Sequence, residues 1–135
     1  MSLDFHLEAD NALSISQIAE CLTQLGVTEV MQTGDSLQGA FPSGLSLEAE
    51  KPGDPFLGAE DTKGLSFPVA MHIYLRVKSP EPKGLSQLDD LEDFITRLAS
   101  LTEAQFLVTF QYESLYYWKD ANGLHQQKSL KRSTT

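Results

Sequence analysis

Residues 106–118 have the sequence FLVTFQYESLYYW and predict a long β-strand, because β-branched and aromatic side chains fit a pleated, half-buried surface. The next turn signal is the sequence DANG at residues 120–123, in which Asn and Gly tolerate a positive φ and predict a type I′ turn. Residues 124–128 are then expected to form a return strand. The end of the chain therefore predicts a β-hairpin rich in aromatic residues.

Two amphipathic helices are predicted from apolar residues that recur at helical spacing. The first is expected to begin after Ser14, since Gln17 lies three residues further on, as a capping box requires. Gly26 is expected to end this helix, because glycine adopts the left-handed conformation at low cost. Ser86 is expected to cap the second helix. Cys21 flanks the apolar stripe of the first helix, which predicts a buried thiol rather than a nucleophile.

Alternation of apolar and polar residues predicts further β-strands. It is clearest at residues 67–78, where odd-numbered side chains are expected to meet the helices, and even-numbered ones to face solvent or a partner. The other strands are predicted at residues 3–8, 27–33, 36–41 and 45–50. Between them, residues 51–66 are rich in glycine, proline and acidic residues and predict a long loop, a feature that is often functional.

This order of elements predicts an α+β fold, a twisted antiparallel β-sheet with two amphipathic helices packed on one face. The chain has 135 residues, and we expect one domain over residues 1–128 and a short, disordered basic tail over residues 129–135. A single cysteine cannot form an internal disulfide, and neither a signal-peptide pattern nor a membrane-spanning apolar stretch is found in the sequence. A cytoplasmic location without a membrane partner is therefore expected.

The net charge of −9 arises from 19 acidic and 10 basic side chains. Such a balance repels nucleic acid and anionic lipid and accelerates association with a basic protein. The alternative interpretation is that the charge only keeps the protein soluble. We expect a protein partner and no nucleic acid.

Known catalytic and cofactor patterns are missing from the sequence. His6, His72 and His125 share no metal-ligand spacing with each other or with Cys21, so no metal site is predicted. The sequence contains neither a glycine-rich phosphate loop nor a nucleophile elbow. We therefore expect no cofactor and no catalytic residues, and predict that the protein is not an enzyme.

One enzymatic alternative stays open. His72, Tyr74 and Arg76 are predicted to lie in a row on one face of a strand, where the histidine could act as a base and the arginine as an anion clamp. The opposing interpretation is an ordinary solvated sheet face. The acidic chain would also repel a phosphate substrate, which favours that interpretation.

The aromatic residues at the end of the predicted long strand suggest an interface. Tyr116 and Tyr117 are consecutive, so strand geometry predicts opposite faces for them and at least one outward-facing ring. Exposed tyrosine and tryptophan side chains are favoured interface anchors. The alternative is that the outward ring shields a sheet edge.

Three segments resemble small bacterial immunity proteins of polymorphic, contact-dependent or type VI-delivered toxin systems. They are GAFPSG at residues 39–44, FLVTFQYE at 106–113 and DANGL at 120–124. The resemblance covers about half of the chain. It implies a small, acidic, cytosolic and non-enzymatic protein that binds one cognate toxin and occludes its active site.

The chain also resembles type III secretion chaperones in length, charge and helix–sheet order. This resemblance implies a dimer that holds a secreted effector. Such chaperones usually close with a further helix, whereas this chain ends in a short basic tail.

The leading hypothesis is an immunity protein, a monomer or homodimer, that binds a cognate toxin or effector with a basic cleft. Carboxylates of residues 51–66 and of nearby strand ends would pair with the basic groups, and aromatic side chains would anchor the contact. The predicted partner-binding residues are Glu48, Glu50, Asp54, Phe56, Glu60, Asp61, Tyr74, Arg76, Tyr116, Tyr117 and Trp118.

Overall fold

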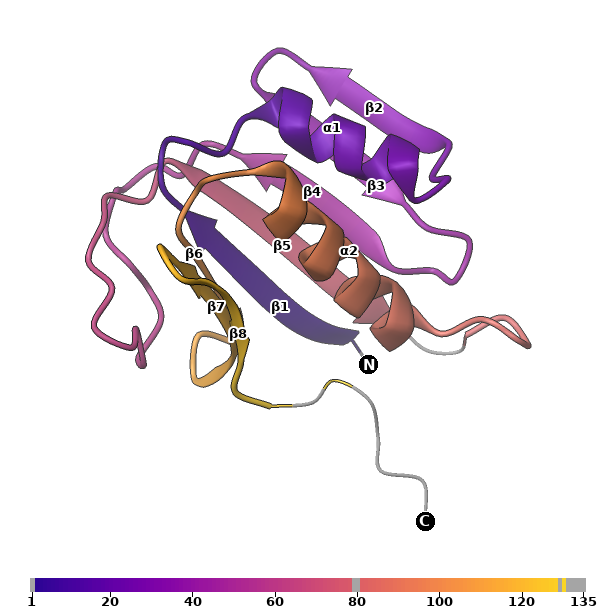
Figure 1. Ribbon diagram of the computed structural model, residues 1–135. Helices are drawn as coiled ribbons and strands as arrows, with labels where there is room; N and C mark the ends of the chain where they lie inside the picture. Colours follow the sequence, from indigo (N-terminus) through magenta and orange to yellow (C-terminus); the bar gives the residue numbers. More distant parts are fainter. Residues whose placement is uncertain (1, 79–80, 129, 131–135) are drawn as a thin grey trace.

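The computed structural model describes residues 2–78, 81–128 and 130, which form one eight-stranded antiparallel sheet and two helices (Figure 1). Both helices lie on the same face of the sheet, so the predicted α+β fold is confirmed. The elements are β1 (Ser2–Ala9), α1 (Ile15–Gln24), β2 (Glu29–Thr33), β3 (Ser36–Ala40), β4 (Ser46–Glu50), β5 (Met71–Lys78), α2 (Gln87–Leu101), β6 (Phe106–Phe110), β7 (Ser114–Asp120) and β8 (Gly123–Gln126).

The strand order is β2-β3-β4-β5-β1-β6-β7-β8, which places the first strand of the chain in the middle of the sheet. β1 pairs with β5 on one side and with β6 on the other, both antiparallel. Two meanders, β2–β5 and β6–β8, are therefore joined only through β1 in the sheet. As a result, side chains of β1 lie beside residues that are far away in sequence.

Both helices begin where the sequence predicts. The Ser14 hydroxyl accepts the Gln17 N–H at 3.2 Å, and the Gln17 side-chain oxygen accepts the Ser14 N–H at 3.0 Å, which completes the capping box. Gly26 follows the end of α1 with φ of +79°. The Ser86 hydroxyl accepts the Asp89 N–H at the start of α2.

The main hydrophobic core lies between both helices and the inner face of the sheet. Its largest fully buried side chains include Leu7, Phe94 and Phe106, which come from β1, α2 and β6. Cys21 is fully buried in this core as predicted, and burial raises the pKa of its thiol to about 12. β3 approaches α1 closely at Gly39, since a Cβ there would lie 3.2 Å from a methyl carbon of Leu22.

The prediction of one long strand over residues 106–118 is wrong, because β6 and β7 form a hairpin within it. Gln111 and Tyr112 form the turn with φ of 54° and 66°, a conformation that non-glycine residues rarely adopt. The turn is held by tertiary contacts: the Gln111 N–H donates to the Asp4 carbonyl at 3.0 Å, and the Tyr112 carbonyl accepts the Glu60 N–H at 2.9 Å. These tertiary contacts stabilise a turn that contains neither glycine nor asparagine, the residues by which a positive-φ turn is usually recognised in a sequence.

The predicted type I′ turn after β7 is also wrong. Asp120 pairs with Gly123, so Ala121 and Asn122 are the central residues, and within this turn Gly123 alone has positive φ, at 115°. The return strand is present as β8. Leu130 is 5% exposed and packs against the main core, whereas the remainder of the predicted tail, residues 129 and 131–135, lies outside the described residues.

We expect Gln111→Gly to stabilise the protein by about 1 kcal/mol, because glycine relieves the positive-φ strain and keeps the backbone bond to Asp4. Urea unfolding measures the change. Gln32→Gly is the matched control, since Gln32 is an exposed residue in β2 without positive φ and its replacement should lower stability. A lower stability of Gln111→Gly would contradict the strain at this turn.

Candidate functional site

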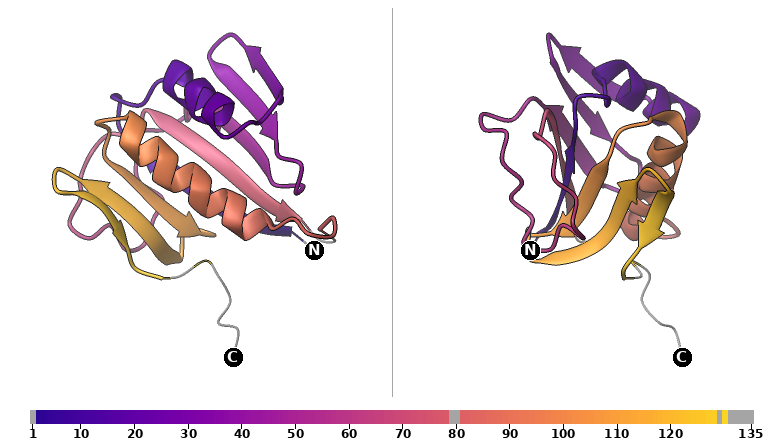
Figure 2. Two further views of the ribbon diagram at one scale, coloured as in Figure 1. Left: turned by 45° about the vertical axis from the view of Figure 1, so that its right-hand side comes forward. Right: turned by 60° about the vertical axis from the view of Figure 1, so that its left-hand side comes forward.

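The outer face of the sheet, opposite the helices, holds the polar side chains that could have a function. Residues 51–70 run along part of this face (Figure 2). They are anchored by Glu8 of β1, whose two carboxylate oxygens accept the N–H groups of Gly58 at 2.7 Å and Ala59 at 3.1 Å. Under the loop, a second small apolar cluster forms around Leu107 and Leu115. The loop therefore divides the outer face into a covered part and an open part.

Glu8 is a buried residue whose carboxylate holds the loop by accepting two of its backbone N–H groups. The residue is 4% exposed, and burial raises the pKa of its carboxyl group, while the two backbone donors oppose that shift. Gly58 has no room for a side chain, because a Cβ would lie 2.9 Å from the ring of Tyr112. The approach of Gly58 to Tyr112 thus connects the loop to the strained turn between β6 and β7.

Three rings stack at the border between the covered and open parts. The imidazoles of His6 and His72 are linked by a 3.0 Å hydrogen bond between Nδ1 of His6 and Nε2 of His72. The ring of Tyr112 lies flat on His6 with centroids 4.0 Å apart, and its hydroxyl is 3.3 Å from Nε2 of His72. Tyr74 contacts His6 edge-on at 5.1 Å.

This aromatic group favours neutral histidines. Burial, followed by the proximity of His72, lowers the pKa of His6 to about 4, and Asp4 opposes the shift. Burial also lowers the pKa of His72, although the carboxylates of Glu50 and Glu48 on β4 oppose it. Both shifts favour the neutral imidazole, in which one ring nitrogen can donate to the other ring.

The row of His72, Tyr74 and Arg76 is present on β5, but its members do not converge on one point. Arg76 donates from Nη2 to the Tyr74 hydroxyl at 2.6 Å and from Nε to a carboxylate oxygen of Asp4 at 3.2 Å. His72 instead pairs with His6. The three side chains therefore belong to two hydrogen-bonded groups, with Arg76 turned towards Asp4 and His72 turned towards His6.

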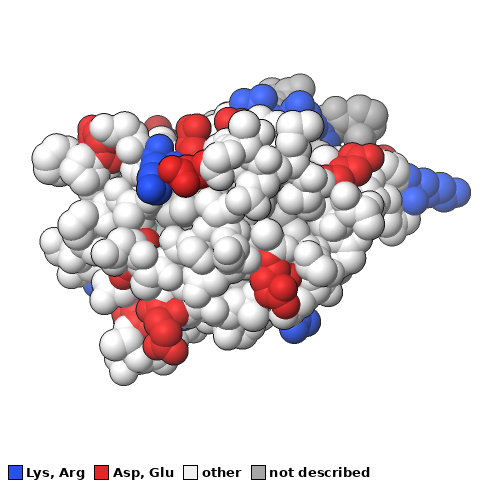
Figure 3. All heavy atoms as spheres, turned by 90° about the horizontal axis from the view of Figure 1, so that it is seen from above, with Lys and Arg blue, Asp and Glu red and all other residues white. Residues whose placement is uncertain are grey.

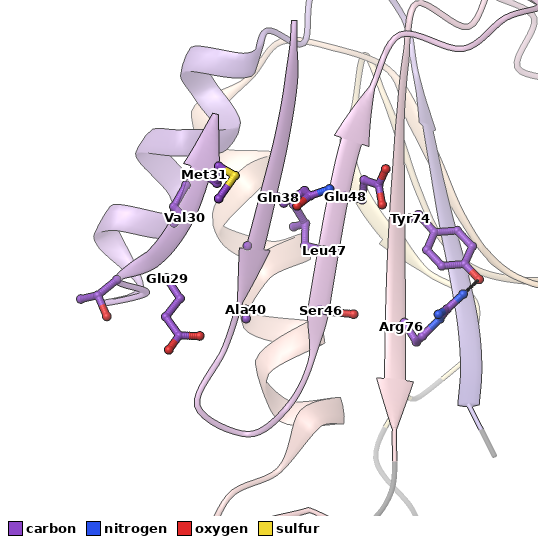
Figure 4. A pocket seen from close by; sticks show the side chains of 12 residues that line it. Glu29, Val30, Met31, Gln38, Ala40, Ser46, Leu47, Glu48, Tyr74 and Arg76 are labelled. Atoms are coloured by element: carbon purple, nitrogen blue, oxygen red, sulfur yellow. Dashed lines mark hydrogen bonds between the residues drawn. The ribbon is translucent and has the colours of Figure 1, made fainter. Parts of the chain in front are cut away.

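A groove of about 600 Å³ lies over the open part of the outer face, where β2, β3, β4 and β5 run side by side (Figure 4). Met31 on β2 is 64% exposed, and Val30 beside it is 38% exposed. Glu29 and Glu48 supply the acidic side chains. The residues that line the groove are Thr28, Glu29, Val30, Met31, Gln38, Gly39, Ala40, Ser46, Leu47, Glu48, Tyr74 and Arg76.

Three of the predicted partner-binding residues, Glu48, Tyr74 and Arg76, line this groove. Glu50 is exposed on β4, opposite His72. On the face seen from above, the acidic side chains lie in several separate groups rather than in one continuous patch (Figure 3). The open groove thus brings together three of the predicted partner-binding residues.

The predicted loop residues do not line the groove. Asp54 accepts the Phe56 N–H at 2.7 Å, and this small turn presents the Phe56 ring, which is 79% exposed. Glu60 bonds through its backbone to Tyr112, and Asp61 forms an ion pair with Lys63 at 3.7 Å. The carboxylates of Asp54 and Asp61 thus bond within the loop itself, and Glu60 contributes its backbone N–H.

The expectation that Tyr116 and Tyr117 face opposite sides is wrong, because a β-bulge interrupts the register of β7 at this point. Tyr116 packs edge-on against Phe5 at 5.4 Å, and Tyr117 is 2% exposed in the same core. Trp118 lies on the outer side, where it stacks on His125 at 4.8 Å and lies 5.5 Å from the ammonium of Lys63. Of the three, Trp118 alone lies outside the main core.

Sequence reasoning missed His6, Tyr112 and Met31 as members of this face. The alternation of β1 already placed His6 on its polar side, but only the pairing of β1 with β5 brings it to His72. Tyr112 was assigned to the middle of a strand rather than to a turn. Met31 is an apolar residue at an outer-face position of an edge strand, which would have indicated an exposed contact. The sequence does not give the strand order, so β2 could not be recognised as an edge strand.

Among the described residues, no helix is both long and apolar enough to cross a bilayer. In the same part of the chain, no three His, Cys, Asp or Glu side chains are grouped so that they could hold a metal ion. Comparison of the chain with protein-family models, with curated proteins and with solved structures found no match.

We expect acidification to weaken the fold through His6. The unfolded chain binds a proton at His6 near pH 6.5 and the folded chain only near about 4, so this contribution to stability is lost as the pH falls between these values. The loss is on the order of 3 kcal/mol, because each pKa unit corresponds to about 1.4 kcal/mol. Urea unfolding at several pH values measures it.

His6→Gln should remove this part of the pH dependence, and His125→Gln, at a half-exposed histidine, should retain it. Glu8, with its raised pKa, changes the stability in the opposite sense, so the difference between wild type and His6→Gln isolates the histidine. Equal pH profiles of wild type and His6→Gln would contradict the neutral His6.

Proposed function

We propose that this protein is a non-enzymatic inhibitor that binds a basic partner protein through the groove over β2–β5. The observation that carries the proposal is the groove itself, which is open, about 600 Å³ in volume, and lined by Glu29 and Glu48 beside an exposed Met31. Exposed methionines and unpaired carboxylates suit a protein surface with apolar and basic side chains. The partner we propose is a cognate bacterial toxin, whose active site is occluded.

Binding is favoured over turnover because the groups with catalytic potential are engaged with one another. His6 and His72 share a hydrogen bond, and both have lowered pKa values. Arg76 is held by Asp4 and by the hydroxyl of Tyr74. An anion would have to displace Asp4 from Arg76 against the net charge of −9.

The proposed contact surface is narrower than the sequence suggested. Glu48, Tyr74 and Arg76 form its floor, and Glu50 lies on the same strand face. Phe56, at the exposed turn of the loop, is available as a separate apolar anchor. Tyr116 and Tyr117 are not part of the proposal, because they pack against the main core.

The decisive test is co-expression with toxins encoded beside this chain. We expect growth to be restored in cells that carry both genes, and a stable complex of toxin and protein on a sizing column. A chain that never restores growth and forms no complex is not an immunity protein. Specific binding means that, with both proteins at micromolar concentration, more of the toxin is in the complex than free.

Charge reversal in the groove should weaken the complex. We expect Glu29→Lys together with Glu48→Lys to reduce the affinity for the basic partner at least about tenfold, because both carboxylates would otherwise face its cationic groups. Glu20→Lys together with Asp93→Lys is the matched control, because it reverses the same number of carboxylates at exposed positions of α1 and α2, on the opposite face of the sheet. Equal losses in the groove variant and in the control would refute the location of the contact.

A further inference from the structure

We infer that β2 is a site of strand addition, at which an extended segment of the partner pairs with the open edge of the sheet. This inference rests on the proposed function, since the segment belongs to the same basic partner. The segment we predict alternates basic and apolar residues. Main-chain hydrogen bonds would supply affinity, and side chains on either face would supply specificity.

β2 has an unprotected edge. It is the terminal strand of the sheet, and all five of its residues are exposed. Neither lysine nor proline occurs in its sequence, EVMQT, although these are the residues that commonly guard edge strands. Its outer-face side chain Met31 already forms one wall of the groove.

The register shows which main-chain groups are open. Thr33 and Ser36 pair next to a two-residue turn, so alternate residues further along β2, Val30 and Gln32, direct their N–H and C=O groups away from β3. The Val30 N–H turns back to the Thr28 carbonyl at 3.1 Å. The N–H and C=O of Gln32 have no such local partner among the described residues.

The opposite edge of the sheet differs. β8 has four residues, three of them half-buried, and it contacts α2. The Gln127 and Lys128 N–H groups that follow β8 donate to the Tyr116 carbonyl of β7, which extends the β7–β8 pairing, so the difference between the two edges rests on the shortness and the burial of β8. Because β2 is fully exposed and β8 is short and mostly half-buried, we assign strand addition to the β2 edge rather than to the β8 edge.

The occupant is a basic segment rather than a second copy of this chain. Each copy carries a charge of −9, and a second β2 would bring another Glu29 to the same edge. In an added strand, alternate side chains lie on the groove side, near Glu29 and Met31, and the others lie on the helix side, near Val30. Basic residues therefore suit the first set and apolar residues the second.

The test uses a nine-residue peptide of alternating lysine and valine, with a glutamate–valine peptide of equal length as its control. Amide hydrogen exchange of the protein, followed by NMR, reports on the backbone of β2. We expect the lysine peptide to slow exchange of the Gln32 amide at least about tenfold and the glutamate peptide to have no effect. Gln32→Pro should lower the affinity for the lysine peptide at least about tenfold, whereas Gln32→Ala, which keeps the N–H, should bind like wild type.

Proline at position 32 should leave the β2–β3 pairing intact, because the Gln32 N–H points away from β3; an unchanged thermal midpoint confirms this. Unchanged exchange at Gln32, equal binding of both peptides, or equal affinity of the proline and alanine variants would overturn the inference. Protection of Gln32 without peptide, together with a doubled mass in solution, would also overturn it in favour of a self-paired dimer.

Toxin neutralisation separates the strand-addition inference from the proposed function. If Gln32→Pro neutralises a toxin as well as wild type does, but the groove charge-reversal variant neutralises it poorly, strand addition fails and the proposed function stands. If wild type itself fails to neutralise, the proposed function fails.

Discussion

Antiparallel pairing of β1 on both of its sides is the constraint on which the rest of the structure depends. The register with β5 and β6 places Phe5 and Leu7 in the main core and His6 and Glu8 on the outer face. A shift of one residue would exchange these two sets, putting an imidazole and a carboxylate under the helices. The burial that fixes the core therefore also fixes where the polar groups of the outer face lie.

The covered part of the outer face follows from that register. Glu8 can anchor the loop only because β1 brings it beneath Gly58 and Ala59. The loop returns a hydrogen bond from Glu60 to the carbonyl of Tyr112, and this bond helps to hold a turn with two unfavourable φ angles. The held turn lays the ring of Tyr112 on His6. Strain in one hairpin is thus offset by contacts that start from the central strand.

Sequence analysis predicted what depends on local pattern. The capping box at Ser14, the stop at Gly26 and the alternation of β5 are properties of a few neighbouring residues, and the structure confirms them. Prediction from sequence failed where contacts between residues far apart in the chain determine the backbone conformation. The turn at Gln111 and Tyr112 carries no turn residues, so only its contacts with Asp4 and Glu60 explain it.

The candidate site was predictable only in part for the same reason. Alternation placed Tyr74 and Arg76 on the outer face, and the acidic residues of β4 were recognised as neighbours of a possible interface. The strand order, which puts β2 at an edge and completes the groove with Met31, is a property of the whole sheet. The bulge at Tyr116 could not be anticipated either, since strict alternation is the only rule that sequence offers within a strand.

The open edge of β2 is a hazard that the charge of the chain offsets. An exposed strand with apolar side chains is a template for edge-to-edge association, and Val30 and Met31 provide such side chains here. Two copies that approach through this edge each carry a charge of −9, so their encounter is disfavoured, more strongly at low salt than at high salt. A basic strand meets the same edge with the opposite sign. Net charge alone would act on every basic protein, whereas the proposed strand addition would also require an extended segment, because the Gln32 N–H and C=O have no local partner in the part of the chain that the structure describes.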